Sequence, residues 1–334
     1  MLRNIRQTLL GGGKTLKSIF SLCLIFQLSA CEEPPREEGL LVGLRSDASS
    51  QIFYLAEAME YFPPEGIHLV TMPLSVDPHY IFQKETFDVM ALPLSTAITW
   101  AEMGEKISVI LVLSSSNGGA SVVFNPRIRN LKGLSNLTIA GSQDESAEYV
   151  IKRMTTLNAI PHQNISFKTM IAENAEKALL ADEVDAAVLP YDATQRLKKL
   201  GYRSLFSTAD IAGEVLEVLV VRTAAIAEHE EHLRQLVAGW RSVHENFGER
   251  LDARPLPEDM ITAQAMKEKL QGMELTSINE NLSYMAQNGR AFDEFMFNYV
   301  RLLRDDRITR LEMSYPLIER QFIFSNAFSN GAEQ

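Results

Sequence analysis

The sequence predicts an α/β protein of two lobes with a helical C-terminal segment. Strands and helices alternate in two sets, one over residues 40–113 and one over residues 137–200. Such alternation favours a parallel sheet with helices on both faces. An apolar strand follows each set, so we expect the chain to cross between the lobes near 118–124 and 214–220.

The first set begins with an apolar strand at 40–44. Apolar residues from Ile52 to Phe62 then repeat at helical spacing and stop at two prolines. Asp77 and Pro78 favour another helix start, because Asp caps a helix well and Pro suits its first turn. The remaining expected elements of this set are strands at 67–72, 87–92 and 107–113 and a helix that starts at 93–95 and ends near Gly104.

The second set has the same alternation of apolar strands and helices. After it, one more apolar strand at 215–221 is followed mainly by helices through Phe324. The expected elements are strands at 120–124, 137–140, 165–169 and 185–189 and helices at 149–157, 175–181 and 191–200.

The first thirty residues have the layout of a bacterial secretion signal. Four basic residues and no acidic ones precede Glu32, and the apolar run at 18–28 is too short to span a bilayer. The run ends in the tetrad Leu28-Ser29-Ala30-Cys31, which resembles the lipobox of bacterial lipoproteins. The resemblance implies that Cys31 carries fatty acid, such as palmitate, and becomes the first residue of the mature chain.

Cysteine usage follows from that interpretation. The chain has two cysteines, and Cys23 would leave with the signal. With Cys31 acylated, the mature chain has no thiol for catalysis, for a zinc site or for an iron–sulfur cluster.

These boundaries predict a chain in five segments. We expect a lipoprotein signal peptide at 1–30, a charged tether at 31–39, a first lobe at 40–118, a second lobe at 119–214, and a return to the first lobe with C-terminal helices at 215–334.

The charge excludes two classes of partner. The formal net charge is −11, and it becomes more negative once the basic signal is removed. This argues against binding to nucleic acid or to an anionic membrane surface. We expect a monomer that has no cofactor and reaches the membrane through its lipid alone.

Six segments occur in an order typical of one family. They are 55–67, 87–89, 128–133, 139–142, 185–188 and 275–323. Together they resemble the periplasmic solute-binding proteins of ABC importers for nitrate, taurine, alkanesulfonates and the pyrimidine precursor of thiamine. The resemblance covers roughly residues 40–324 and implies a type II periplasmic-binding-protein fold: two lobes, a cleft, and hinge closure on a small molecule. Glu60 replaces a family glycine, and Leu189-Pro190-Tyr191 replaces a Trp-Glu-Pro-like turn. Because of these departures, the resemblance does not identify the ligand.

The candidate binding residues follow from strand ends. In open parallel sheets, ligands bind beyond the carboxyl ends of the strands. The loops there contain Ser46, Asp47, Gln51, Tyr54, Leu92, Pro93, Ser95, Ser115, Ser116 and Asn117 in the first lobe and Ser142, Gln143, Asp144, Tyr191, Asp192 and Glu214 in the second lobe and its crossing. The serines among them also make good helix caps without any ligand.

The charge of the ligand is predicted from the same loops. Four of the loop residues are acidic, and Arg45 is the one base nearby, which favours a neutral or cationic ligand stacked on Tyr54 or Tyr191. Helix amino ends at Ser95 and Ser142 offer backbone N–H groups that suit a small anion instead.

Other chemistry finds little support in the sequence. His229-Glu230-Glu231-His232 lacks the i, i+4 spacing of a zinc-protease helix and suits a solvated helix face. No histidine falls in the cleft loops, so we expect no catalytic residues and no metal.

Three functions remain in competition. The first is a lipid-anchored, extracytoplasmic solute-binding protein that faces the periplasm or outer surface and serves an ABC permease. The second is a ligand-sensing subunit for a membrane signalling protein. The third is an enzyme like those that make the thiamine pyrimidine. Glu32 follows Cys31 where Asp would signal inner-membrane retention, which favours the second function. Permease and ATPase genes beside this gene would favour the first.

Overall fold

The structure is a computed structural model that describes most of the chain after residue 38. The described residues are 39–45, 48–63, 65–72, 76–132, 134–142, 145–250, 266–268, 270–285, 290–304 and 316–328. The chain divides into two units at 1–38 and 39–334, and every described residue belongs to the second. The predicted signal peptide, Cys31 and nearly all of the tether therefore lie outside the described residues. Within the described part, no helix is long and apolar enough to cross a membrane.

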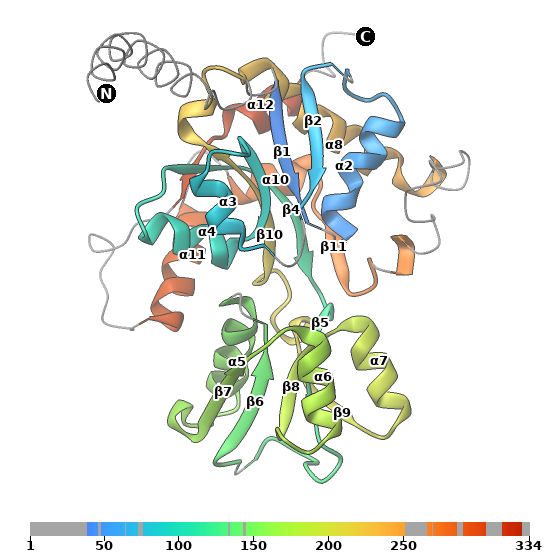
Figure 1. Cartoon of the computed structure of the whole chain (residues 1–334), viewed down its shortest axis with the longest axis vertical. Helices are drawn as coiled ribbons and strands as arrows, with labels where there is room; N and C mark the ends of the chain where they lie inside the picture. Colours follow the sequence, from blue (N-terminus) through green and yellow to red (C-terminus); the bar gives the residue numbers. More distant parts are fainter. Residues whose placement is uncertain are drawn as a thin grey trace, which may run out of the picture. The chain divides into compact units, whose positions relative to one another are not determined.

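Among the described residues, the first sheet has seven strands in the order β11-β4-β10-β3-β1-β2, with β12 beside β4. Figure 1 labels β1, β2, β4, β10 and β11 of this sheet. We call this sheet and its helices the first lobe. Its strands are β1 (Leu40–Leu44), β2 (Ile67–Thr71), β3 (Val89–Pro93), β4 (Ile107–Ser116), β10 (Leu216–Arg222), β11 (Met273–Leu275) and β12 (Leu317–Ile318).

In the described part of the chain, the second sheet has five strands in the order β7-β6-β8-β5-β9 (Figure 1). We call this sheet and its helices the second lobe. Its strands are β5 (Ala120–Phe124), β6 (Leu137–Gly141), β7 (Ile165–Thr169), β8 (Ala186–Pro190) and β9 (Arg203–Ser207). Strands β9, β11 and β12 were not predicted from the sequence.

Both sheets are mixed, so the expectation of parallel sheets is wrong. Strand β1 pairs in parallel with β2 and β3, but β10 runs antiparallel to β3 and β4. In the second sheet, β5 runs antiparallel to β8 and β9. The reason is the crossing itself. Leu216 begins β10 opposite Ser115, near the end of β4, so the returning strand enters at the carboxyl edge and must run the other way.

The helices follow the predicted order. Two have clear capping signals: Asp77 accepts a hydrogen bond from the His79 backbone, and Ser277 with Glu280 forms a capping box. The helices are α2 (Ala48–Ala58), α3 (Pro78–Gln83), α4 (Leu94–Glu102), α5 (Glu145–Leu157), α6 (Ala172–Leu180), α7 (Tyr191–Lys199), α8 (Glu230–Arg250), α10 (Ile278–Tyr284), α11 (Arg290–Leu303) and α12 (Gln321–Phe328), with short 3-10 turns η1 (His162–Asn164), η2 (Thr208–Ile211) and η3 (Thr223–Ala225).

The first-lobe core is built on β4 and α8. The apolar residues of β4 are completely or nearly completely buried. Trp240 of α8 is also fully buried, lies 5.4 Å from Phe53 of α2 between ring centroids, and donates its indole N–H to the Thr276 carbonyl. Phe292 and Tyr299 of α11 are buried as well.

Two crossing segments connect the sheets: residues 117–119 lead from β4 to β5, and residues 208–215 lead from β9 to β10. They are tied to each other by Thr208, whose hydroxyl oxygen lies 2.8 Å from the Ser116 hydroxyl oxygen and accepts from the Gly118 N–H. Residues before β11 join the same cluster, because Asn117 donates its backbone N–H to the Gly272 carbonyl at 2.7 Å.

Candidate functional site

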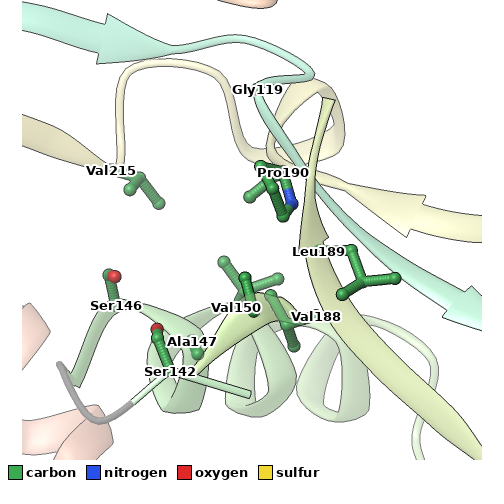
Figure 2. A pocket seen from close by; sticks show the side chains of 11 residues that line it. Gly119, Ser142, Ser146, Ala147, Val150, Val188, Leu189, Pro190 and Val215 are labelled. Atoms are coloured by element: carbon green, nitrogen blue, oxygen red, sulfur yellow. The ribbon is translucent and has the colours of Figure 1, made fainter. Parts of the chain in front are cut away.

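A pocket of about 220 Å³ lies at the carboxyl edge of the second sheet, beside both crossing segments (Figure 2). Strands β6 and β8 run parallel, so the loops that follow them meet at one edge. The pocket is lined by Gly119, Ala120, Ser142, Ser146, Ala147, Val150, Ala172, Val188, Leu189, Pro190 and Val215.

The lining combines apolar side chains with two hydroxyls. Figure 2 shows Val215 across the space from Ser142 and Ser146, which supply the hydroxyl groups. Among the residues that the structure describes, none that lines the pocket is charged. A small pocket with a few placed polar groups on apolar walls suits a ligand that has both an apolar part and hydrogen-bonding atoms.

Helix amino ends add hydrogen-bond donors around this edge. Ser146 and Ala147 lie in the first turn of α5, and Ala172 is the first residue of α6. Ile171, the N-cap of α6, makes no side-chain capping bond, and neither does Pro190 before α7. Uncapped first-turn N–H groups and the positive end of the helix dipole favour ligand atoms that accept hydrogen bonds.

The corresponding edge of the first lobe is the β3–α4 junction. Leu92 and Pro93 are buried and pair with Val218 and Glu217 of β10. Ser95, in the first turn of α4, is 2% exposed, and no described residue hydrogen-bonds to its hydroxyl. A buried hydroxyl without a partner is uncommon in folded proteins, which singles out this helix end.

Glu214 on the second crossing segment is held by the second lobe. Arg153 of α5 donates to its two carboxylate oxygens at 2.5 and 2.7 Å, and the Tyr149 hydroxyl donates at 2.7 Å. Burial, followed by the hydrogen bond and charge of Glu214, raises the pKa of Tyr149 well above its ordinary value. Tyr149 thus stays a donor, and Arg153 balances the Glu214 charge.

Helix α5 also contacts the C-terminal helices. The Tyr149 ring stacks on Tyr299 of α11, with centroids 3.9 Å apart and ring planes at 8°. Lys152 donates to the Leu303 carbonyl at the end of the same helix. One helix of the second lobe is therefore joined both to a crossing segment and to α11.

The family of the chain is shown by sequence comparison. Residues 48–244, more than half of the chain, match the family described as NMT1/THI5 like. The chain belongs to the NMT1/THI5-like family. Comparison with curated protein sequences gives no match.

Solved structures share the fold of this NMT1/THI5-like chain. The ligand-binding component of an ABC-type import system from Staphylococcus aureus aligns with a TM-score of 0.66 at 11% identity, over 87% of this chain and 99% of that one. The alkanesulfonate-binding protein SsuA from Xanthomonas axonopodis pv. citri, bound to MOPS, gives a TM-score of 0.61 at 14% identity, over 87% and 100%.

A third structure adds the same fold. The putative periplasmic sulfonate-binding protein SsuA from Methylobacillus flagellatus KT gives a TM-score of 0.63 at 13% identity, over 89% of this chain and 96% of that one. The resemblance found in the sequence and the predicted two-lobed type II periplasmic-binding-protein fold are both confirmed.

The predicted site residues of the NMT1/THI5-like chain do not all meet in one place. Ser142 lines the pocket, while Tyr191 and Asp192 follow Pro190 at its rim. The sequence prediction also included Ser46, Asp47, Gln143 and Asp144, which lie outside the described residues.

Several first-lobe candidates are engaged within the protein. Gln51 donates its amide to the Arg45 carbonyl at 3.3 Å, and the Tyr54 hydroxyl lies 2.8 Å from the Thr71 hydroxyl. Ser116 bonds to Thr208, as described above. Asn117 donates its side-chain amide to Glu274 at 2.7 Å. The last two therefore lie at the crossing segments and do not line the first pocket.

Asp192 has a partner on its own helix. Arg196, four residues on, donates to it at 2.8 Å and also reaches Glu176 at 2.8 Å, and the Asp192 side chain is 71% exposed. Together with the Arg153–Glu214 contact, this means that two of the four acidic residues used to predict ligand charge are balanced by arginines.

Sequence reasoning missed the apolar part of the pocket. In the sequence, Val188 and Leu189 of β8 and Val215 before β10 have the pattern of ordinary strand residues, and Pro190 has the pattern of a turn residue. The rule that ligands bind beyond strand ends, applied to the last residues of each strand as well as to the loops, would have included them.

The histidines of 229–232 are less exposed than a solvated face requires. The His229 side chain is 10% exposed, with its Nε2 3.9 Å from the carboxylate of buried Asp88. The His232 ring lies 6.0 Å from that of His229 between centroids and packs close to Gly66. Among the described residues, no group of three or more His, Cys, Asp or Glu side chains is placed to hold a metal ion.

Proposed function

We propose that this NMT1/THI5-like protein is an extracytoplasmic solute-binding protein, anchored by lipid at Cys31, that captures a small molecule for an ABC permease. The observation that carries the proposal is the pocket at the carboxyl edge of the second sheet, which both crossing segments border. A ligand there touches the elements on which any rotation between lobes depends. The structural relatives include a ligand-binding component of an ABC-type import system, which supports the same role.

The ligand we propose is small, with an apolar part against Val188 and Val215 and an acceptor group facing Ser142, Ser146 and the helix amino ends. Because Arg153 and Arg196 balance Glu214 and Asp192, the case for a cationic ligand rests on Asp47 and Asp144. Ser95, at the first-lobe edge, would complete the site on closure. We propose no catalytic role for any residue of the site.

A thermal-shift screen tests this function. Wild-type protein is heated with MOPS, taurine, nitrate, hydroxymethylpyrimidines and small amines, one at a time. A ligand present at 100 times its dissociation constant adds about 2.7 kcal/mol of stability. We expect at least one compound to raise Tm and Ser142→Val to reduce that shift. The absence of any shift that depends on Ser142 would contradict binding in this pocket.

The anchor is tested separately by Cys31→Ala. The variant should lose labelling by a fatty-acid probe and keep its uncleaved apolar signal, because acylation and cleavage both require that cysteine. Persistent labelling would exclude Cys31 as the lipid site.

Sensing is a second candidate function, favoured by Glu32 directly after Cys31, where Asp would indicate retention at the inner membrane. Uptake of the identified ligand by cells that lack this protein separates the two. Reduced uptake supports import, whereas unchanged uptake with a lost transcriptional or signalling response supports sensing.

A further inference from the structure

A second pocket, of about 370 Å³, lies beside the crossing segments at β11 and shares no lining residue with the first. Its walls include Ser115 at the end of β4, Gly213 on the second crossing segment, and residues of β11 and α10. Strand β11 is at the opposite edge of the first sheet from β2, with β10 and β4 between it and the β1 and β3 strand ends. This pocket is therefore separate from the site proposed above.

Two residues with hydroxyl side chains and low overall exposure line this pocket. Ser115 is 7% exposed and Thr276 is 4% exposed, and both line the space. The Thr276 backbone is fully used, since its N–H donates to the Leu113 carbonyl and its carbonyl accepts from Trp240. Among the described residues, none hydrogen-bonds to either hydroxyl. Both hydroxyl oxygens keep some access to solvent, so they can bond to a group that occupies the pocket.

Two further lining residues, Glu274 and Glu280, supply carboxylate acceptors that carry negative charge. Glu274 uses Oε1 to accept from Asn117, and Glu280 uses Oε2 to accept from Ser277. The second oxygen of each carboxylate has no bond to any described residue. No described lining residue is basic.

The pKa of Tyr284 indicates how close the two carboxylates are to its hydroxyl. Its side chain lines the pocket, and its hydroxyl lies near Gly213, since a Cβ added to that glycine would lie 3.8 Å away. Burial, then the charges of Glu280 and Glu274, raises the pKa of Tyr284. Both carboxylates are thus close enough to act on the same hydroxyl.

We propose that this second pocket binds a small primary amine in its ammonium form. An ammonium group has three N–H donors and no acceptor, which matches two carboxylate oxygens and the hydroxyls of Ser115 and Thr276. A metal ion fits less well because the described residues hold no cluster of three metal-binding side chains. The bound amine connects the second crossing segment to β11 and α10, so its occupancy biases the arrangement of the segments that join the lobes.

Isothermal titration calorimetry on the mature chain tests the site. The probes are ethanolamine hydrochloride and putrescine dihydrochloride, with 1,4-butanediol as the uncharged counterpart of putrescine. We expect at least one amine to bind and butanediol not to bind. Glu274→Gln keeps an acceptor for Asn117 but removes the charge, and should weaken amine binding about tenfold or more. Thr276→Val, which keeps the side-chain shape, should also weaken it.

Two controls locate the effect. Glu183→Gln removes one exposed carboxylate elsewhere and should leave amine affinity unchanged, as should Ser142→Ala in the first pocket. Failure of both amines to bind, equal affinity in Glu274→Gln and wild type, or equal binding of butanediol overturns the proposal. Loss of amine binding in Ser142→Ala also overturns it, because the amine would then occupy the first pocket.

Discussion

Thr208 on the second crossing segment accepts a hydrogen bond from the backbone N–H of Gly118 on the first, at an N···O distance of 2.9 Å. The same hydroxyl lies 2.8 Å from the Ser116 hydroxyl oxygen, and Thr208 is fully buried. One side chain therefore contacts a backbone group of the other crossing segment and a hydroxyl at the end of β4. Any rotation of one lobe against the other acts on this contact.

Replacing Thr208 by valine should destabilise the protein. The change keeps the shape but leaves the Gly118 N–H without its acceptor, at a cost of about 1–3 kcal/mol. Urea unfolding measures the free energy. Thr169→Val, at the exposed end of β7, is the matched control and should change stability by less than about 0.5 kcal/mol. Equal effects of the two substitutions would show that Thr208 has no special role.

Gly272→Ala should cost more than Gly201→Ala. Both glycines have positive φ, +79° and +91°, so both substitutions carry backbone strain of about 1–2 kcal/mol. At Gly272 the new Cβ would also meet the Gly119 nitrogen at 2.5 Å, whereas Gly201 has nothing within 4 Å. The difference in unfolding free energy between the two variants gives the cost of the steric contact between residue 272 and Gly119, because the backbone strain is common to both. No difference would mean that the backbone relaxes freely there.

Stability should fall as the pH rises above about 10, the ordinary tyrosine pKa. Tyr149 has its pKa raised in the folded state, so the unfolded chain loses this proton first and is favoured at high pH. Below that pH both states keep the proton, so the stability no longer changes with pH through this group. Tyr149→Phe should be less stable at neutral pH, having lost the bond to Glu214, but should show a shallower fall of Tm in alkaline buffer.

Tyr80→Phe controls for that experiment, because Tyr80 is 57% exposed. Tyr54 and Tyr284 also have raised pKa values and contribute to the alkaline fall in every variant. An alkaline slope in Tyr149→Phe as steep as that of Tyr80→Phe would contradict the assignment to Tyr149.

Filling the first pocket should abolish binding there without unfolding the protein. Ala172 lines the pocket at the start of α6 and is only partly buried, so Ala172→Phe can project a ring into the space. We expect the thermal shift caused by the ligand from the screen to disappear. Ala181→Phe, at the exposed end of the same helix, should keep the shift. A retained shift in Ala172→Phe would locate the ligand elsewhere.

The sequence predicted most elements because apolar periodicity and capping residues are local signals. The helix at Asp77-Pro78 began where its cap required. The antiparallel pairing of β5 and β10 could not be predicted, because an apolar strand has the same sequence pattern in parallel and antiparallel pairs. The short strands β11 and β12 are defined mainly by pairing with β4, which lies more than 150 residues earlier in the chain.

The sequence predicted the site residues that lie in loops after strands. It did not predict contacts between residues that are far apart in the sequence. Ser142 followed from its place after a strand. The partner of Asp192 is four residues away on a helix, a spacing that the sequence displays. The partner of Glu214 is 61 residues away, so its neutralisation by Arg153 became visible only in three dimensions.

The strand order also determines how soon each sheet can be completed as the chain emerges. All five strands of the second sheet come from one continuous stretch, 120–207. Strand β4, at 107–116, must wait for partners near 216, 273 and 317. Long sequence separations between contacting residues slow folding. The chain loses the conformational entropy of the intervening loop before the new contacts can stabilise it. The second lobe can therefore fold early as a unit, while the first stays open until the last helices have been made.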